Sequence, residues 1–216
     1  MKYIDVNSLD ELPELPQDQR YFDTIGGSKN FRCFIAPKDY PRNIFLLENE
    51  HLLDKCLSPI YKNNGITVRQ DTSCPLPGFY IVAPDKHYKS LDEIPIIDYI
   101  RLMFIIYNIR KGLRSIMHID YAYLLYEEKE NPSCNVHFWI LPITDIKKYP
   151  RMYKFDIKQY MDTFELKNNH GKIINTNMKM ISYLESEKII EKDNRILTDF
   201  MFLLNDESNK SNLMGY

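Results

Sequence analysis

The segment Asn135–Pro142 constrains the fold of this chain more than any other. Its sequence, N-V-H-F-W-I-L-P, alternates polar or amphipathic residues with apolar ones, which is typical of a β-strand with one face in a core. Residues two apart in a strand share a face, so one face would carry Asn135, His137, Trp139 and Leu141. The other face would carry Cys134, Val136, Phe138 and Ile140. The pattern therefore predicts a strand that packs on a core and presents an imidazole on its second face.

Composition excludes several classes of protein. The chain has 216 residues, 44% of them hydrophobic and 27% charged, which suits a folded domain with additions. A net charge of −2 gives no electrostatic footprint for long contacts with nucleic acid. A modest basic cluster at residues 147–154 is interpreted as solvated surface. There is no run of 18 apolar residues and no signal peptide at the N-terminus, so we expect no membrane association.

The cysteines indicate neither a disulfide framework nor a metal site. They are Cys33, Cys56, Cys74 and Cys134, and no two of them form a C-x-x-C pair. The histidines outside the key strand and residue 87 also lack ligand-like spacing. We therefore predict no metal, no cofactor and a cytoplasmic location, where thiols stay reduced.

Local patterns predict an α+β fold on an antiparallel sheet. Short strands are expected at residues 43–47, 66–69, 79–83 and 121–126. Ser90–Glu93 matches a capping box, and the main helix is expected from about residue 95 to 113, with Gly112 as its stop signal. Its face toward the sheet would carry Ile96, Ile100, Met103, Phe104 and Tyr107. One or two amphipathic helices are expected within residues 179–204.

The order of these features resembles the histidine triad (HIT) superfamily, which includes nucleotide hydrolases and nucleotidyltransferases. Asp71 is followed six residues later by Pro77, a buried strand ends in Ala83-Pro84-Asp85-Lys86-His87, a helix follows, and N-V-H-F-W-I-L-P comes about 50 residues after His87. The resemblance covers residues 31–143 and implies a HIT-like nucleotide-binding catalytic domain there. Residues 1–30 would form an irregular N-terminal arm, and residues 144–216 a helical extension.

The resemblance implies a role for each motif residue. The family hallmark is three alternating histidines, and here the three positions are Asn135, His137 and Trp139, so only the central imidazole is retained. By position, His137 is the nucleophile that forms a covalent nucleotidyl-histidine at the α-phosphate. Asn135 could donate hydrogen bonds to phosphoryl oxygens, whereas Trp139 has only an indole N–H and cannot shuttle a proton. The remaining matches are Asp71 to the ribose hydroxyls, His87 as a supporting residue, and Asn131 and Ser133 at the phosphates.

Each of these residues also has a purely structural interpretation. His137 could be a hydrogen-bonded core histidine, Asp71 could cap a turn, His87 could be an ordinary loop residue, and Trp139 could fill the sheet face. Cys134 and His137 fall on opposite strand faces, which excludes a thiol dyad between them.

Three functions remain open from the sequence. The first is a nucleotide-processing enzyme, either a nucleotidyltransferase, a phosphorylase or a hydrolase, acting through nucleotidyl-His137. The second is a nucleotide-binding protein with a degenerate triad that acts as a sensor or a partner. The third, an enzyme that processes RNA ends, conflicts with the charge balance. A homodimer is expected from the resemblance. The sequence specifies neither the nucleobase, nor the leaving group, nor the acceptor.

Overall fold

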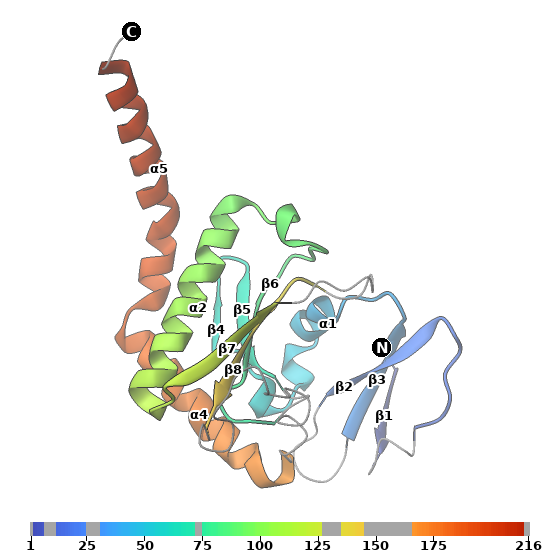
Figure 1. The fold of residues 1–216 in the computed structure, drawn as a ribbon. Coiled ribbons are helices and arrows are strands. Elements are labelled where there is room, and N and C mark those ends of the chain that lie inside the picture. The colour runs from blue at the N-terminus through green and yellow to red at the C-terminus, as the bar shows by residue number, and fades with distance from the viewer. Residues whose placement is uncertain are drawn as a thin grey trace, which may run out of the picture.

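The computed structural model describes residues 2–6, 12–24, 31–71, 75–126, 135–144 and 166–213, and it has an α+β fold (Figure 1). Its centre is a five-stranded sheet in the order β4-β5-β6-β8-β7, in which every neighbouring pair is antiparallel. The strands are β4 (Tyr61–Asn63), β5 (Ile66–Gln70), β6 (Tyr80–Pro84), β7 (Tyr121–Tyr126) and β8 (Phe138–Ile143). The predicted fold class is confirmed, and β7 has the predicted bounds.

The two faces of the sheet belong to different hydrophobic clusters. On the face toward the main helix, Phe138 and Ile140 join the largest core cluster. On the opposite face, Leu141 packs with Phe79 in a second cluster, and Trp139 borders it. We call this opposite side the second face. The predicted alternation is therefore confirmed from Phe138 to Leu141. The predicted start of the strand at Asn135 is wrong, because β8 begins at Phe138 and residues 135–137 precede it.

The main helix α2 (Ile96–Met117) follows a short 3-10 turn, η4 (Leu91–Glu93), as predicted. Two details of the prediction are wrong. The helix continues past Gly112 to Met117, and the residue after it, His118, has a left-handed backbone with φ 54°. The buried stripe is also different, because Ile96 and Tyr107 are 65% and 66% exposed. The residues buried on α2 are Leu102, Ile105, Ile106, Asn108, Ile109, Gly112 and Leu113.

The physical reason is that α2 packs against three partners. They are the sheet, the helix α4 (Leu166–Ser186) and the helix α5 (Ile189–Leu213). At Gly112 a Cβ atom would lie 2.6 Å from the Met180 sulfur and 2.8 Å from the Tyr183 ring. The glycine is therefore the point where α4 approaches α2 closely, and its stop-like appearance in the sequence is misleading.

The N-terminal part forms a separate sheet of three antiparallel strands in the order β1-β3-β2. They are β1 (Lys2–Val6), β2 (Gln19–Thr24) and β3 (Phe31–Pro37), so the irregular structure predicted for residues 1–30 is wrong for β1 and β2. The strand predicted at residues 43–47 is also wrong, because α1 (Arg42–Glu48) is a helix. A five-residue apolar run has no resolvable period, and tertiary packing of Phe45 determines its structure.

The C-terminal helices α4 and α5 (Ile189–Leu213) confirm the helical prediction for this region. Met180, Tyr183, Leu184 and Ile189 belong to the largest core cluster, so both helices contribute to the fold. The distal part of α5 extends beyond the body of the protein (Figure 1).

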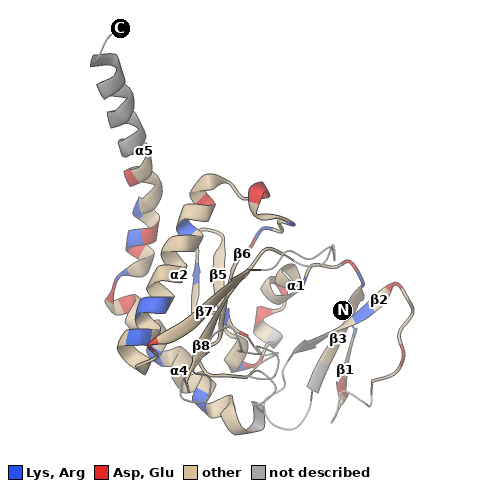
Figure 2. Cartoon of the chain, viewed as in Figure 1, with Lys and Arg blue, Asp and Glu red and all other residues tan. Residues whose placement is uncertain are grey.

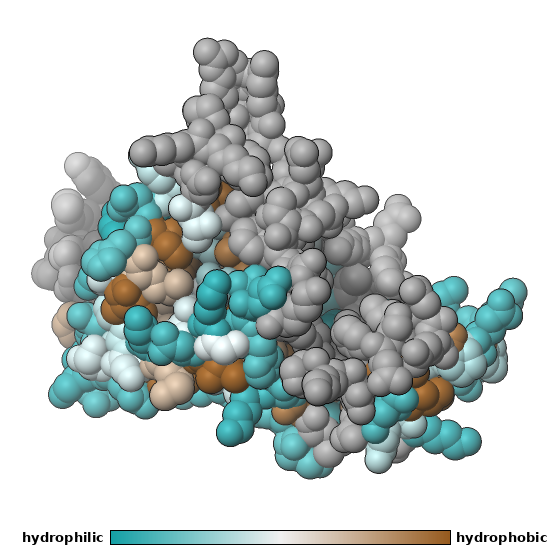
Figure 3. Space-filling model, turned by 90° about the horizontal axis from the view of Figure 1, so that it is seen from below, coloured by the Kyte–Doolittle hydropathy of each residue, from teal (hydrophilic) through white to brown (hydrophobic). Residues whose placement is uncertain are grey.

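The surface of the described residues mixes polar and apolar groups. Acidic and basic residues alternate along α5 in Figure 2, and Lys188 and Lys192 pair with Glu191 and Glu187. Hydrophobic and hydrophilic residues lie in small neighbouring patches over the face in Figure 3. Among the described residues, no helix has the length and apolar character needed to cross a membrane.

Candidate functional site

His137 lies directly before β8, half-buried, with its ring held by a backbone oxygen. Its Nδ1 lies 2.7 Å from the carbonyl oxygen of Asn135. A carbonyl oxygen can only accept a hydrogen bond, so Nδ1 carries the proton. In the neutral ring the lone pair is then on Nε2, which makes Nε2 the nucleophilic nitrogen. The Trp139 ring packs edge-on against the imidazole, with centroids 4.8 Å apart and planes at 70°.

Strand register places Asp71, His137 and Trp139 on the same face of the sheet. Trp139 is paired with Ile81, and Ile81 with Arg69, so these three residues share a row across the sheet. His137 precedes Trp139 by two residues, and Asp71 follows Arg69 by two, which keeps both on the second face. They lie on either side of the Trp139 row, each about 7 Å along the strand direction. By register, the position of Trp139 therefore lies between those of His137 and Asp71 along the strand direction.

The Asn135 side chain ties β8 to the loop that follows β6. Asn135 is 9% exposed, its Oδ1 accepts from the Tyr88 backbone N–H at 2.6 Å, and its Nδ2 donates to the Pro84 carbonyl at 2.8 Å. The Val136 N–H donates to the Tyr88 carbonyl at 2.9 Å. These bonds occupy the amide oxygen and one amide N–H, so most of the side chain's hydrogen-bonding capacity stabilises the fold.

His87 lies in this same loop, directly before Tyr88. Both of its ring nitrogens are buried, and neither has a hydrogen-bond partner among the described residues. A buried polar atom without a partner costs about 1–3 kcal/mol, which a bound water molecule or ligand would recover. The loop thus brings His87 to the part of the chain that holds Asn135 and His137.

Asp71 directly follows β5 and is 5% exposed. Its backbone N–H donates to the Phe79 carbonyl at 2.7 Å, which extends the ladder between β5 and β6. Gln70 closes the loop that follows, since its Nε2 donates to the carbonyls of Asp71 and Leu76 at 2.8 Å. The backbone around Asp71 is therefore fixed.

Two predicted phosphate contacts, Asn131 and Ser133, lie outside the described residues. So do Cys74, Cys134 and the basic cluster at residues 147–154.

Sequence reasoning missed Arg69, a buried cation on the second face. Its side chain is 8% exposed, Nη1 donates to the Leu57 carbonyl at 2.7 Å, and Nη2 lies 3.4 Å from Glu50 Oε2. Burial lowers the pKa of the Arg69 guanidinium, and the Glu50 charge opposes this. No local signal indicates this burial, because alternation with Val68 places Arg69 on the other face of the strand, where an arginine is expected to be exposed.

A second polar cluster joins two segments that are distant in the sequence. Asp54 and Cys56 flank the start of the 3-10 turn η3 (Lys55–Leu57), and His170 lies near the start of α4. Burial raises the pKa of the Cys56 thiol, and the Asp54 carboxylate adds to this effect. Burial also tends to raise the pKa of Asp54, but hydrogen bonds from Cys56 and His170 outweigh it and lower that pKa.

Comparisons with known proteins give matches to solved structures only. No protein-family model and no curated protein matches the chain. A hypothetical histidine triad nucleotide-binding protein from Sulfolobus tokodaii is 17% identical, over 67% of this chain and 93% of that one, with a TM-score of 0.45. A HIT-like protein from Bartonella henselae is 16% identical, over 66% and 96%, with a TM-score of 0.43. A HIT family member from Bacillus subtilis is 15% identical, over 63% and 94%, with a TM-score of 0.41.

These structures carry the name of the superfamily that the sequence motifs resemble. Their TM-scores are below 0.5, so the likeness is partial and no residue role is taken from it.

Proposed function

We propose that this chain is a nucleotide-processing protein of the HIT type, which binds a nucleotide or nucleotide conjugate on the second face and uses His137 Nε2 as a nucleophile. The observation that carries the proposal is the hydrogen bond between His137 Nδ1 and the Asn135 carbonyl, because it selects the tautomer with Nε2 as the nucleophilic atom. The bond also stabilises the cationic ring that forms when Nε2 becomes substituted.

The covalent chemistry takes two displacements at phosphorus. In the first, Nε2 attacks the α-phosphorus of the nucleotide, the Nε2–P bond forms, the bond from phosphorus to the leaving group breaks, and the leaving group takes the electron pair. In the second, water or an acceptor attacks phosphorus, the Nε2–P bond breaks, and its electron pair returns to the imidazole. The proton of the attacking water or hydroxyl acceptor passes to the solvent.

The row of side chains on the second face supports the placement of the nucleotide. Asp71 would accept hydrogen bonds from the ribose hydroxyls, and Trp139, whose position by register lies between those of Asp71 and His137, would contact the sugar or the base. His87 would meet a hydrogen-bond partner that the described residues do not supply. Asn131 and Ser133 remain proposed phosphate contacts.

Trp139 favours a substrate with a good leaving group. An indole N–H donates a hydrogen bond but does not transfer its proton, so this position cannot protonate a leaving oxygen or nitrogen. We therefore expect that the chain acts on substrates whose leaving group departs without a proton, such as a phosphate or pyrophosphate. A transferase or phosphorylase with a second substrate fits this constraint at least as well as a hydrolase.

The hydrogen bonds of the Asn135 side chain favour one alternative function, which is reversible nucleotide binding without turnover. The Asn135 amide is occupied by Tyr88 and Pro84, which leaves little of it for a transition state. In that case the chain would bind a nucleotide as a sensor or partner protein and form no adduct.

Intact-protein mass spectrometry with a panel of nucleotides tests the proposal. The panel contains dinucleoside polyphosphates, nucleotide sugars and nucleoside phosphoramidates, and the variants are His137→Ala and, as a matched control, the exposed His51→Ala. We expect an acid-labile gain of one nucleotidyl mass in the wild type and in His51→Ala, and none in His137→Ala. Saturable binding without an adduct would favour the alternative. If the chain shows no nucleotide binding and forms no adduct, both the enzyme and the binding protein are excluded.

A further inference from the structure

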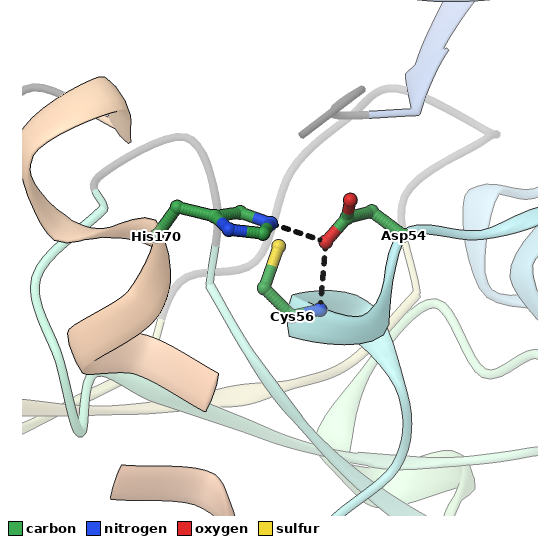
Figure 4. A group of neighbouring side chains, drawn as sticks. All are labelled: Asp54, Cys56 and His170. Carbon is green, nitrogen blue, oxygen red and sulfur yellow. Dashed lines mark hydrogen bonds and ion pairs between the residues drawn. The ribbon is translucent and has the colours of Figure 1, made fainter. Parts of the chain in front are cut away.

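The Asp54, Cys56 and His170 side chains converge from two segments (Figure 4). One oxygen, one sulfur and one nitrogen atom, each able to ligate a metal, lie within 4.8 Å of one another. Nε2 of His170 lies 2.8 Å from Asp54 Oδ1, and the Cys56 backbone N–H donates to the same oxygen at 2.9 Å. The cluster is shielded from solvent, with side-chain exposures of 25% for His170 and 16% for Asp54, and Cys56 is 0% exposed.

These donor types and spacings suit zinc. Zinc takes thiolate sulfur at about 2.3 Å, imidazole nitrogen at about 2.0–2.1 Å and carboxylate oxygen at about 2.0–2.2 Å in a tetrahedral arrangement. Ligand atoms around one such ion are therefore roughly 3.3–3.6 Å apart. His170 Nε2 and Asp54 Oδ1 are 2.8 Å apart, which is shorter than this range. All three ligand atoms lie within 4.8 Å of one another, a limit that is longer than this range. Small side-chain rotations would bring all three atoms onto one ion.

The charges also match a divalent cation. A carboxylate and a thiolate together carry two negative charges, and the imidazole binds metal as a neutral ligand. A Zn²⁺ ion would make the three-ligand site neutral. Neutrality favours a site of this burial, since an uncompensated charge is costly away from water.

Packing around the cluster fixes the protein ligands in place. Ile173, one turn after His170 on α4, packs with Cys56 and Leu57 in a separate small hydrophobic cluster. Asn177, one further turn along, donates from Nδ2 to the Cys56 carbonyl at 3.2 Å and is 5% exposed. The face of α4 that carries His170 is thus docked on the turn that carries Cys56, so a site here is largely preformed.

A nucleophilic thiol is the main chemical alternative, because a histidine with a carboxylate partner can activate a cysteine. Complete burial of Cys56 opposes it, since a substrate has no access to the sulfur. A metal ion needs no such access once it is bound.

We propose that Asp54, Cys56 and His170 bind one zinc ion, which joins α4 to the segment before the central sheet and leaves a fourth coordination position for a water molecule. No metal site is expected from the sequence, because His170 lies 116 residues from Asp54 and no short ligand motif is present. The inference is independent of the chemistry proposed at His137.

The test is metal binding by the full chain after removal of metal with a chelator. Co²⁺ is titrated into the apoprotein as a spectroscopic probe, and zinc content is measured by mass spectrometry after Zn²⁺ loading and desalting. The variants are Cys56→Ala and His170→Gln. Cys33→Ala is the matched control, because Cys33 is also a buried cysteine but lies in β3, outside the cluster. Glutamine keeps a donor for Asp54 but is a poor zinc ligand, so it separates metal binding from the hydrogen bond. Circular dichroism verifies that each variant is folded.

We expect one Zn²⁺ per wild-type chain, visible bands of tetrahedral Co²⁺ and a near-ultraviolet thiolate-to-cobalt band. Each variant should lose the thiolate-to-cobalt band or bind metal with an affinity more than about 100-fold lower than the wild type. The reason is that loss of even a residue hydrogen-bonded to a metal ligand lowers metal affinity by about 10- to 100-fold. Cys33→Ala should behave as the wild type. Wild-type protein that takes up no stoichiometric metal, or equal binding by His170→Gln, would overturn the proposal and leave a hydrogen-bonded joint only.

Discussion

At the scale of the single residue, the Asn135 side chain joins two backbone segments that the candidate site needs together. Its Oδ1 accepts from Tyr88 and its Nδ2 donates to Pro84, both in a buried environment. The carbonyl of the same residue holds the His137 ring. Displacement of Asn135 would therefore disturb the loop that carries His87 and the orientation of the imidazole at once.

Asn135→Ala should lower the free energy of unfolding by about 2–6 kcal/mol, because two buried backbone groups lose their partners at about 1–3 kcal/mol each. Urea denaturation followed by circular dichroism measures this. Asn175→Ala, an exposed asparagine on α4, is the control and should change stability by less than about 0.5 kcal/mol. Equal stability of Asn135→Ala and the wild type would contradict the bridging role.

Glu50 predicts a dependence of stability on pH. Burial tends to raise its pKa, but the hydrogen bond from Lys62 and the charge of Arg69 outweigh this, so the pKa of Glu50 lies below its usual value of 4.5. A carboxylate with a lowered folded-state pKa stabilises the fold above pH 4.5 and loses this effect as the pH falls.

Glu50→Gln should therefore cost less than about 1 kcal/mol at pH 7, since Glu50 is partly solvated. The difference from the wild type should shrink as the pH falls through 4.5. Urea melts at pH 7 and at about pH 3 measure it. A difference that grows on acidification would show that the ion pairs of Glu50 have the opposite effect.

At the scale of the element, the contact between α2 and α4 depends on Gly112. A methyl group there would meet the Met180 sulfur at 2.6 Å and the Tyr183 ring at 2.8 Å. Gly112→Ala should destabilise the protein by about 1–3 kcal/mol, as expected for overpacking.

Gly171, near the start of α4, is the matched control. Nothing lies within 4 Å of a Cβ built on it, so Gly171→Ala should stabilise the protein by about 0.5–1 kcal/mol through helix propensity alone. Thermal melts of both variants measure the contrast. Two shifts of the same sign would show that helix propensity, and not the helix contact, determines the effect at Gly112.

The attachment of α5 depends on Asp193, which is fully buried. Its Oδ2 accepts from the Tyr61 hydroxyl at 2.8 Å and from the side chains of Asn63 and Asn64 at 2.8 and 2.9 Å, while Arg101 lies 3.8 Å from Oδ1. This acidic residue joins α5 to the β4–β5 turn and to α2. Its partners face it from three different elements.

Asp193→Ala should cost about 3–5 kcal/mol, because Tyr61, Asn63 and Asn64 lose their charged, buried acceptor and, among the described residues, Arg101 keeps only the Asp98 carboxylate. Tyr61→Phe should cost about 1 kcal/mol in the wild type and much less in Asp193→Ala, since the hydroxyl then has lost its acceptor. A double-mutant cycle in urea measures the coupling. Additive effects would exclude a direct energetic link between Tyr61 and Asp193.

Some elements could be predicted from the sequence, and others depended on contacts that no local pattern contains. β7 has the predicted bounds because Y-A-Y-L-L-Y is strongly β-forming and is bounded on both sides by polar residues. The strands β1 and β2 were missed, since their stability comes from pairing with β3. The buried face of α2 was misassigned because the sheet, α4 and α5 all cover that helix.

At the scale of the whole molecule, the same distinction applies to the sites. The alternation of faces along Phe138–Leu141 is local, and it could be predicted. The tautomer of His137 could not, because it depends on a backbone oxygen whose position only the fold defines. The cluster of Asp54, Cys56 and His170 is beyond sequence reasoning for the same reason, since α4 has to dock before the donors meet.

The two ends of the chain should differ in their importance for folding. Phe22, Phe34, Ala36 and Phe45 form the cluster of the N-terminal sheet, which shares no residue with the main core. A chain of residues 49–216 loses this cluster and the Asn43 hydrogen bond to Asp85, and it keeps the main core whole. It should still unfold in one cooperative transition, at a lower temperature than the full chain.

A chain of residues 1–165 should not unfold in one cooperative transition. It lacks Met180, Tyr183, Leu184 and Ile189, whose burial contributes about 1.5–3 kcal/mol each, and the sum of about 6–12 kcal/mol equals most of the stability of a typical domain. The exposed face of α2 should then bind a hydrophobic dye, and the thermal transition should lose its cooperativity. Calorimetry and dye fluorescence of both shortened chains provide the comparison. Cooperative unfolding of residues 1–165 would show that α4 and α5 are an appendage to a self-sufficient domain, as the sequence alone suggested.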